Sequence, residues 1–192
     1  MRVISGKKRG LKLTSIENTN VRPTLDRVKE NIFNIISKEI VGSVFMDIFG
    51  GFGGIGIEAY SRGAKKVYIF EIENKNFKII TKNVSKLDAK NNIEVFNEDY
   101  KYGIKKNSNE NIKADIIYID PPYYYEIDEY LNILENIKNS NILKEKSKII
   151  IECEKQIQNQ ILENYENIKD FEIIDKRNYG RAAIVFLQKE GK

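Results

Sequence analysis

Short apolar runs alternate along the chain with stretches in which apolar residues recur every three or four positions. The runs are typical of buried strands, which we predict at 43–48, 66–70, 93–96, 115–119, 148–152, 172–176 and 183–187. The helical spacing predicts helices at 55–62, 74–88, 126–139 and 155–165. This alternation favours an α/β fold whose mostly parallel, seven-stranded sheet has helices on both faces.

The carboxyl-terminal end of the pattern breaks the alternation. No helical spacing separates the last two apolar runs, and their connection at 177–181 is short. We therefore predict an antiparallel hairpin at the end of the sheet, which is a departure from a plain dinucleotide-binding fold. The polar stretch at 105–113 is predicted to be a loop, too short for a domain linker. We expect a single domain over residues 1–192, with the sheet in 43–192.

Residues 1–42 precede the predicted sheet as an amino-terminal extension. Two short apolar runs, at 3–4 and 11–13, bracket the basic residues Lys7, Lys8 and Arg9. This spacing predicts a β-hairpin with a basic tip. Such a tip can contact a phosphate or form an ordinary solvated turn, and the pattern favours neither.

A helix is predicted to follow in this extension, from Leu25 to Ile36. Thr24 is well placed as its N-cap. Apolar residues at helical spacing are expected to face the core, namely Leu25, Val28, Ile32, Ile35 and Ile36. The basic residues Arg22, Arg27 and Lys29 are expected on or near the exposed side.

A cluster of glycines follows the first predicted strand. A strand that ends in glycines and turns directly into a helix lets a ligand approach the backbone, and the first helical amides point toward that ligand. Gly51, Gly53 and Gly56 have the G-x-G-x-x-G spacing of dinucleotide-binding loops, and Glu71 lies 20 residues after Gly51, where a ribose-binding acid is expected. The pattern predicts a nucleotide site, the alternative being a purely structural turn. It does not separate a hydride-transfer enzyme from a methyltransferase.

Composition narrows the chemistry further. The chain has no histidine, which excludes imidazole general bases, Ser-His triads and histidine-ligated metals. Its one cysteine, Cys153, excludes disulfides within the chain and thiolate zinc clusters. A formal charge of +4 suits a nucleic-acid partner. Because no apolar run reaches membrane-spanning length and the amino terminus lacks a signal-peptide pattern, we expect a cytoplasmic protein.

A second motif, Asp120-Pro121-Pro122-Tyr123, comes directly after the predicted strand at 115–119. Two consecutive prolines cannot continue a strand, so the chain must leave the sheet in a rigid conformation. The Asp120 carboxylate and the proline carbonyls then lie at the carboxyl ends of the strands, where open α/β sheets bind their ligands.

The donors and acceptors of this motif match the amino group of a nucleobase. An exocyclic amine has two N–H donors, which a carboxylate and a backbone carbonyl can accept together. Tyr123 offers a ring on which the base can stack, worth roughly 1–3 kcal/mol. The motif therefore predicts a binding site for a base amine, the alternative being a proline-rich turn capped by an aspartate.

Three stretches together resemble the bacterial RsmD-type methyltransferases. They are the glycine loop at 47–58, the Asp-Pro-Pro-Tyr motif at 120–123 and the Arg-Pro-Thr-x-Asp-Arg-Val-Lys segment at 22–29. The similarity runs from Ser5–Gly10 to Tyr179-Gly180, nearly the whole chain. The first two stretches are shared with amino-methyltransferases generally, whereas the third points to this family. The resemblance implies a class I, Rossmann-like methyltransferase fold and methylation of the N2 amine of one guanine in 16S ribosomal RNA.

The resemblance also implies which residues bind each substrate. Those for S-adenosylmethionine are Asp47, Gly51, Gly53, Gly56, Glu71 and Asp99, with Glu98 as the alternative to Asp99 at the adenine. Those for the target guanine are Asp120, Pro121, Pro122 and Tyr123. The family usually carries a small residue at the position of Phe52, whose ring either crowds the methionine end of the cofactor or packs elsewhere. Separately, the basic residues of the extension are candidate RNA-phosphate contacts: Arg2, Lys7, Lys8, Arg9, Arg22 and Arg27.

The function expected from these features is guanine-N2 methylation of 16S ribosomal RNA, bare or in the small subunit, by a monomer that uses neither metal nor membrane. An adenine-N6 or cytosine-N4 methyltransferase stays open, because Asp-Pro-Pro-Tyr serves all three amines. An NAD-dependent oxidoreductase would explain the glycines and Glu71 but would leave 120–123 unused. An RNA-binding assembly factor without catalysis would have no need of an intact Asp120.

Overall fold

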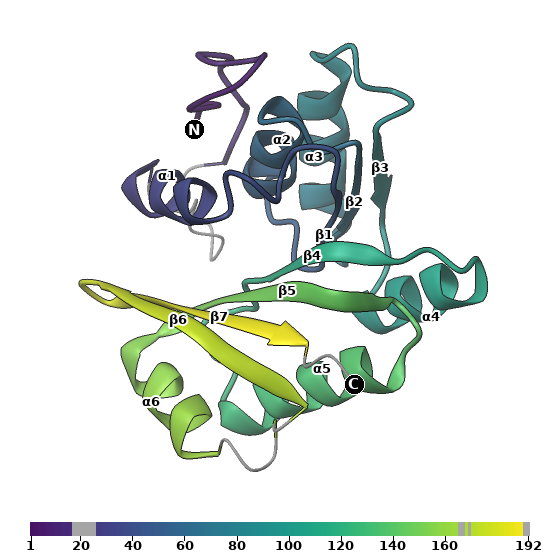
Figure 1. Ribbon diagram of the computed structural model, residues 1–192. Helices are drawn as coiled ribbons and strands as arrows, with labels where there is room; N and C mark the ends of the chain where they lie inside the picture. The colour runs from purple at the N-terminus through teal and green to yellow at the C-terminus, as the bar shows by residue number, and fades with distance from the viewer. Residues whose placement is uncertain (17–25, 165–167, 169, 190–192) are drawn as a thin grey trace. The chain divides into compact units, whose positions relative to one another are not determined.

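The computed structural model describes residues 1–16, 26–164, 168 and 170–189. Its helices and strands, drawn in Figure 1, are α1 (Asp26–Ile35), β1 (Val44–Asp47), α2 (Gly54–Ser61), β2 (Lys66–Phe70), α3 (Asn74–Ser85), β3 (Ile93–Phe96), α4 (Tyr100–Asn109), β4 (Ala114–Ile119), α5 (Ile127–Asn139), β5 (Leu143–Glu154), α6 (Lys155–Glu163), β6 (Phe171–Tyr179) and β7 (Ala182–Lys189). This confirms the predicted α/β class, with a mostly parallel seven-stranded sheet and an antiparallel pair at its carboxyl-terminal end. The chain forms two compact units, residues 1–103 and 104–192.

The first unit contains three parallel strands in the order β3-β2-β1. Asp47 pairs with Ile69 and Phe70 pairs with Phe96, so the three strands end at one edge of the sheet. Helix α2 packs on β1 and β2, and α3 packs on β3. The residues that follow the three strands are therefore brought together at that edge, as the sequence predicts for a ligand site.

The second unit contains strands in the order β4-β5-β7-β6, of which β4 and β5 are parallel. Helices α5 and α6 lie on the same side of these strands (Figure 1). The antiparallel pairing of β6 with β7 confirms the predicted hairpin. Its turn is tighter than predicted, because β6 continues until Tyr179 pairs with Ala182 and leaves Gly180 and Arg181 as the turn. Gly180 has φ +71°, which two-residue hairpin turns require.

Strand β5 begins well before the predicted start at residue 148. Its first half carries an irregularity, because the register with β4 shifts between Ala114 and Ile116. The Ser147 hydroxyl holds this bulge by donating to the Ala114 carbonyl at 2.7 Å and accepting the Lys144 amide at 2.7 Å. A polar run can thus continue a strand where its side chains bond back to the sheet.

The loop predicted at 105–113 is wrong in its first half, which belongs to helix α4. The buried positions of this helix are Tyr100, Gly103, Ile104 and Asn107, which recur at helical spacing. Because two of these four residues are a glycine and an asparagine, the apolar spacing that reveals an amphipathic helix is incomplete. The other predicted helices and strands match the observed ones to within a few residues, apart from the early start of β5 and the extension of β6.

The predicted amino-terminal hairpin is present in reduced form. Its two arms form a single antiparallel bridge between Arg2 and Lys12. The Val3 amide also donates to the Leu11 carbonyl at 3.0 Å, and the Val3 carbonyl accepts the Gly10 amide at 2.9 Å. The predicted Thr24 N-cap, the predicted Leu25 core position and Arg22 lie outside the described residues. None of the described helices is long and apolar enough to cross a membrane.

Lys29 contradicts the prediction that it is exposed. It is 1% exposed, and its Nζ donates to the Arg2 carbonyl at 2.7 Å. The same nitrogen lies 3.8 Å from Oε2 of the buried Glu58 on α2. A lysine can occupy a core position when a carboxylate and a carbonyl there interact with its ammonium group. The spacing of apolar residues in α1 does not indicate either partner. Arg27 is exposed, as expected.

Candidate active site

The glycine loop of the first unit joins β1 to α2 by a tight turn. The Gly53 amide donates to the Gly50 carbonyl at 2.7 Å, and Gly53 has φ +80°. Helix α2 then starts at Gly54, and its N-cap residue Gly53 contributes no side-chain hydrogen bond to the first amides. These amides are the groups that a helix start can offer to an anion or to a polar ligand.

Gly56 serves the packing of α2 against β2. A Cβ built at this position would lie 2.6 Å from Cδ1 of Ile69, a residue that is fully buried. Such an approach is closer than carbon atoms allow, so no side chain fits between the helix and the strand. The structural role predicted as the alternative for the glycines therefore holds for Gly56, and its contact with a cofactor stays a prediction.

Asp47, the last residue of β1, is buried beneath this loop. Its Oδ2 accepts the Gly56 amide at 3.2 Å, whereas its Oδ1 is buried with no hydrogen-bond partner among the described residues. Burial raises the pKa of the Asp47 carboxyl to about 7, partly offset by the amides of Gly56 and Phe49. A buried carboxylate oxygen without a partner is unfavourable, and a ligand with an N–H or O–H donor would satisfy it.

Glu71 follows β2 and ties the loop to the next segment. Its Oε2 accepts the Gly51 amide and its Oε1 accepts the Glu73 amide, both at 2.8 Å. Burial raises the pKa of Glu71, and the two amides counteract the rise. The Asn76 side chain also donates to this carboxylate. A carboxylate has about four acceptor sites, so the arrangement is still compatible with binding a ribose hydroxyl.

Ile72 is a residue that the sequence analysis missed. It stands directly after Glu71 and is 63% exposed, which is unusual for a large aliphatic side chain. Asn97 fixes the backbone beneath it by donating to the carbonyls of Glu71 and Ile72, each at 2.9 Å. An isoleucine after a strand is most often a core residue, so the sequence gives no sign of its exposure.

Asp99 lies at the start of α4, after β3. Its Oδ1 accepts the Lys101 amide at 2.7 Å, which is the geometry of a helix N-cap. Asp99 is half-buried and the neighbouring Glu98 is exposed. The structure thus gives Asp99 a capping role in addition to its predicted contact with adenine.

Phe52 is 3% exposed, so its ring is withdrawn from solvent. Its carbonyl accepts Nδ2 of the buried Asn83 at 3.0 Å, which fixes this part of the loop to α3. The ring at this position is therefore packed inside the first unit, and its effect on the methionine end of the cofactor is left open by these contacts.

In the second unit, Asp120–Tyr123 leaves the sheet directly after the buried strand β4, as predicted. Pro121 is buried and Pro122 is exposed, while Asp120 is half-buried. The Tyr125 amide donates to the Pro122 carbonyl at 2.9 Å and closes a turn. The segment is thus held by the prolines and by this bond before any ligand arrives.

Several titratable side chains surround this segment within the second unit. The Tyr118 hydroxyl donates to Glu152, the residue before Cys153 on β5. Cys153 is buried, and this burial raises the pKa of its thiol to about 12, with Glu152 and Asp120 adding to the rise. A thiol with such a pKa is a poor nucleophile. Cys153 is therefore a small residue of the core.

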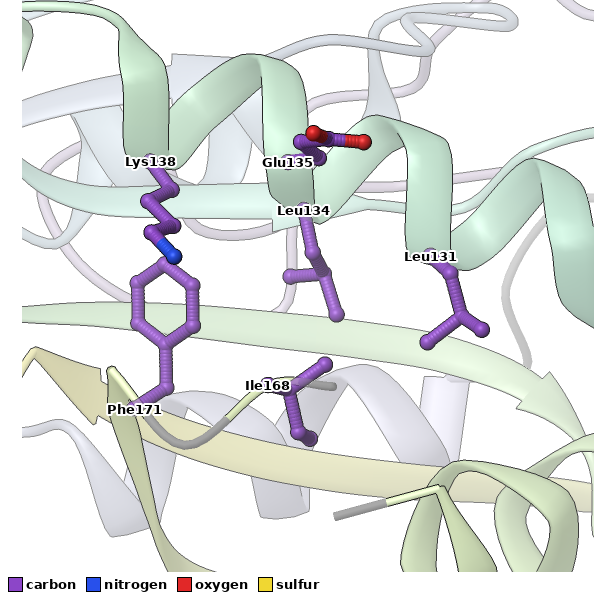
Figure 2. A pocket seen from close by; sticks show the side chains of 6 residues that line it. All are labelled: Leu131, Leu134, Glu135, Lys138, Ile168 and Phe171. Carbon is purple, nitrogen blue, oxygen red and sulfur yellow. The ribbon is translucent and has the colours of Figure 1, made fainter. Parts of the chain in front are cut away.

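A hollow of about 310 Å³ lies elsewhere in the second unit. Figure 2 shows Leu131 and Leu134 projecting from α5 toward Ile168. Its lining residues are Leu131, Leu134, Glu135, Lys138, Ile168 and Phe171. None of these is a predicted site residue, so we give this hollow no part in the reaction.

The basic tip of the amino-terminal extension is anchored on the end of α2. The amides of Lys7 and Lys8 donate to the carbonyl and the hydroxyl of Ser61, at 2.8 and 2.9 Å. The Lys7 ammonium lies 3.6 Å from the centre of the Tyr60 ring. Arg9 is exposed, and Arg2 pairs with Asp26 at 3.1 Å. The tip is therefore a fixed basic surface, as a phosphate contact requires.

Comparison with known proteins places this fold and these motifs in a family. The model of the family described as Conserved hypothetical protein 95 matches residues 1–188. Ribosomal RNA small subunit methyltransferase D of Buchnera aphidicola is 38% identical over 155 residues, which are 80% of this chain and 78% of that protein.

Solved structures share the whole fold. The Escherichia coli protein yhhF has a TM-score of 0.82 and 25% sequence identity, over 100% of this chain and 99% of that chain. SMU.776, solved in complex with SAH, has a TM-score of 0.71 and 16% identity, over 88% of this chain and 50% of that chain, and shows the fold alone. Because the family model spans nearly the whole chain, the protein belongs to the Conserved hypothetical protein 95 family, and its resemblance to the RsmD-type methyltransferases is confirmed.

Proposed function

We propose that this protein transfers the methyl group of S-adenosylmethionine to the exocyclic N2 amine of a guanine in 16S ribosomal RNA. The observation that carries the proposal is the rigid Asp120–Tyr123 segment after a buried strand, in a chain of this family. The name of the Buchnera relative supports ribosomal RNA of the small subunit as the substrate. We further propose that the protein works as a monomer in the cytoplasm, on RNA that is bare or already in the subunit.

The first unit supplies groups that fit S-adenosylmethionine. The buried Oδ1 of Asp47 lacks a donor, the Glu71 carboxylate can accept ribose hydroxyls, and the exposed Ile72 offers an apolar surface to the adenine. Asp99 or Glu98 would accept the adenine amino group. When bound, this cofactor supplies a methyl group already activated by its sulfonium charge.

The second unit supplies groups that fit the base. The two N–H groups of the guanine amine would be accepted by the Asp120 carboxylate and by a proline carbonyl. Of the two proline carbonyls, that of Pro122 already accepts the Tyr125 amide, so Pro121 is the better candidate. Tyr123 is 68% exposed and can stack on the base.

Catalysis by these residues would consist chiefly of orientation. Asp120 and Pro121 would hold the amine so that its lone pair points away from them, and Asp120 or water would take the proton after transfer. Orientation of this kind can contribute roughly 7–11 kcal/mol. The guanine must also leave its stack to reach the segment, at a cost of a few kcal/mol.

The test is to incubate the protein with methyl-labelled S-adenosylmethionine and 16S ribosomal RNA, either protein-free or in small subunits, and to map the labelled base. We expect N2-methylguanine at one position. Label on an adenine or on a cytosine would instead assign the protein as an adenine-N6 or a cytosine-N4 methyltransferase. Cofactor binding without any transfer to either form of the RNA would contradict the proposed enzyme activity.

A further inference from the structure

Three consecutive tyrosines follow the prolines of the second unit. Tyr123 and Tyr124 are each 68% exposed, whereas Tyr125 is half-buried. The ring centres of Tyr123 and Tyr124 are 6.0 Å apart, and those of Tyr124 and Tyr125 are 5.5 Å apart. The proposed reaction uses the first ring and leaves the second, equally exposed, without a function.

The main chain around Tyr124 forms a closed turn, and a neighbouring ring restricts its side chain. Tyr124 stands between Pro122 and Tyr125, whose carbonyl and amide form a hydrogen bond of 2.9 Å. The ring of the half-buried Tyr125 also contacts the Tyr124 ring, with an angle of 62° between the two planes. An exposed ring that is already ordered loses little entropy on binding, which suits it to stacking on a planar ligand.

The angle between the first two rings indicates what such a ligand would be. The planes of Tyr123 and Tyr124 make an angle of 79°. A base stacked on Tyr123 and a base stacked on Tyr124 would then be nearly perpendicular, unlike neighbours in a helix. A nucleotide chain turns in this way beside a base that has left its stack.

We propose that Tyr124 is a second stacking platform, which binds the base adjacent to the target nucleotide. This inference rests on the proposed function, since it places the target base on Tyr123. It extends that function by making the substrate a stretch with two unstacked nucleotides, as found in single-stranded loops of RNA.

The test compares Tyr124→Ala and Tyr124→Phe on an RNA fragment that contains the mapped guanine. Tyr124→Ala should raise KM for this RNA roughly tenfold or more, because the stacking surface is lost, while kcat changes by less than about twofold. Tyr124→Phe keeps the ring and should behave as the wild type. Ile174→Ala, which trims another exposed apolar side chain of the same unit, is the control and should have no effect.

A matched change in the RNA identifies the occupant of the platform. Replacing the base on one side of the guanine by an abasic site should raise the wild-type KM by the same factor, and should raise that of Tyr124→Ala no further. An unchanged KM in Tyr124→Ala would overturn the proposal. The proposal would also fail if, for the base on either side of the guanine, the abasic site raised the KM of Tyr124→Ala by the same factor as that of the wild type.

Binding measurements distinguish this inference from the proposed function. If the wild type methylates no RNA base, the proposed function fails. Fluorescence anisotropy with single-stranded RNA still tests the platform in that case. Weaker binding by Tyr124→Ala than by Tyr124→Phe supports it, and equal binding by the two variants overturns it.

Discussion

Lys29 and Glu58 form a buried ion pair, with Nζ and Oε2 separated by 3.8 Å and side chains 2% and 0% exposed. Glu58 also accepts the amides of Ile4 and Ser5 at 2.8 and 3.0 Å, and Nε of Arg62 at 2.8 Å. One carboxylate thus attaches the basic amino-terminal extension and α1 to α2, the helix that follows the glycine loop.

Replacing Glu58 by alanine should lower the free energy of unfolding by about 3–5 kcal/mol, because it leaves two amides and two cations without their acceptor. Urea denaturation would measure the change. Glu94→Ala is the control, since Glu94 pairs with Lys66 at the surface and should cost less than about 1 kcal/mol. Equal losses in the two variants would contradict the stabilising role assigned to the buried cluster.

Gly56→Ala should destabilise the protein by about 1–3 kcal/mol, because the added methyl group would lie 2.6 Å from Ile69 in a packed core. The matched change is Gly54→Ala, in the same helix. A Cβ at Gly54 would meet only the end of the Met1 side chain, which can move. Thermal denaturation of both variants should therefore show a loss for Gly56→Ala alone, and a loss of similar size at Gly54 would contradict this account.

The spacing of apolar residues was enough to predict the order of the seven strands and of the described helices other than α4, because a buried strand and an amphipathic helix each need their own period. It also located the Asp120-Pro121-Pro122-Tyr123 segment correctly after a strand. The period failed where a polar residue fills a core position. In α4 the buried residue Asn107 interrupts the apolar spacing of the buried face. In β5 the hydrogen bond of Ser147 allows a polar run to continue the strand.

The site residues were less predictable than the fold. Motif spacing pointed to Glu71, and the family resemblance pointed to Asp47. Asp47 ends β1 and Glu71 follows β2, and these two strands end at one edge of the sheet. Lys29 was misplaced and the function of Glu58 was missed, because their contacts join segments far apart in the sequence. Ile72 was missed because only the folded chain reveals that its side chain is exposed.

Asp47 should make the stability of the protein fall as the pH rises. Its folded pKa, about 7, lies above the ordinary value of 3.8, so the folded state holds its proton between these values and the unfolded state does not. The stabilisation is complete at low pH and is lost as the pH rises from about 4 to about 7. Relative to Asp47→Asn, the wild type should lose about 3 kcal/mol between pH 5 and pH 8.

Urea denaturation of both proteins at several pH values would measure this difference. The pKa of Glu71 is also raised, but Glu71 is present in both proteins, so its contribution cancels to first order. Parallel stability curves for the two proteins would show that Asp47 does not titrate in this range.

Arg9 should contribute to RNA binding through a phosphate. It is an exposed residue of the anchored basic tip, so Arg9→Ala should weaken binding to all RNA sequences and lower the slope of log K against log salt by about 1. Lys38→Ala removes an exposed charge that follows α1 and is the control. If both variants show the wild-type slope, the tip does not contact the RNA backbone.

Asp120 should be needed for methyl transfer and dispensable for cofactor binding. In the proposed reaction its carboxylate accepts an N–H of the base amine, whereas the groups that fit the cofactor are Asp47, Glu71 and Ile72. Asp120→Ala should therefore lower kcat by roughly 10²–10³-fold, the loss typical of removing one orienting group. Asp120→Asn keeps one acceptor oxygen and should lose less.

Calorimetric titration with S-adenosylmethionine should give the same Kd for both variants and the wild type. A weaker affinity for S-adenosylmethionine in these variants would indicate that Asp120 belongs to the cofactor site. An unchanged kcat in Asp120→Ala would show that Asp120 takes no part in methyl transfer.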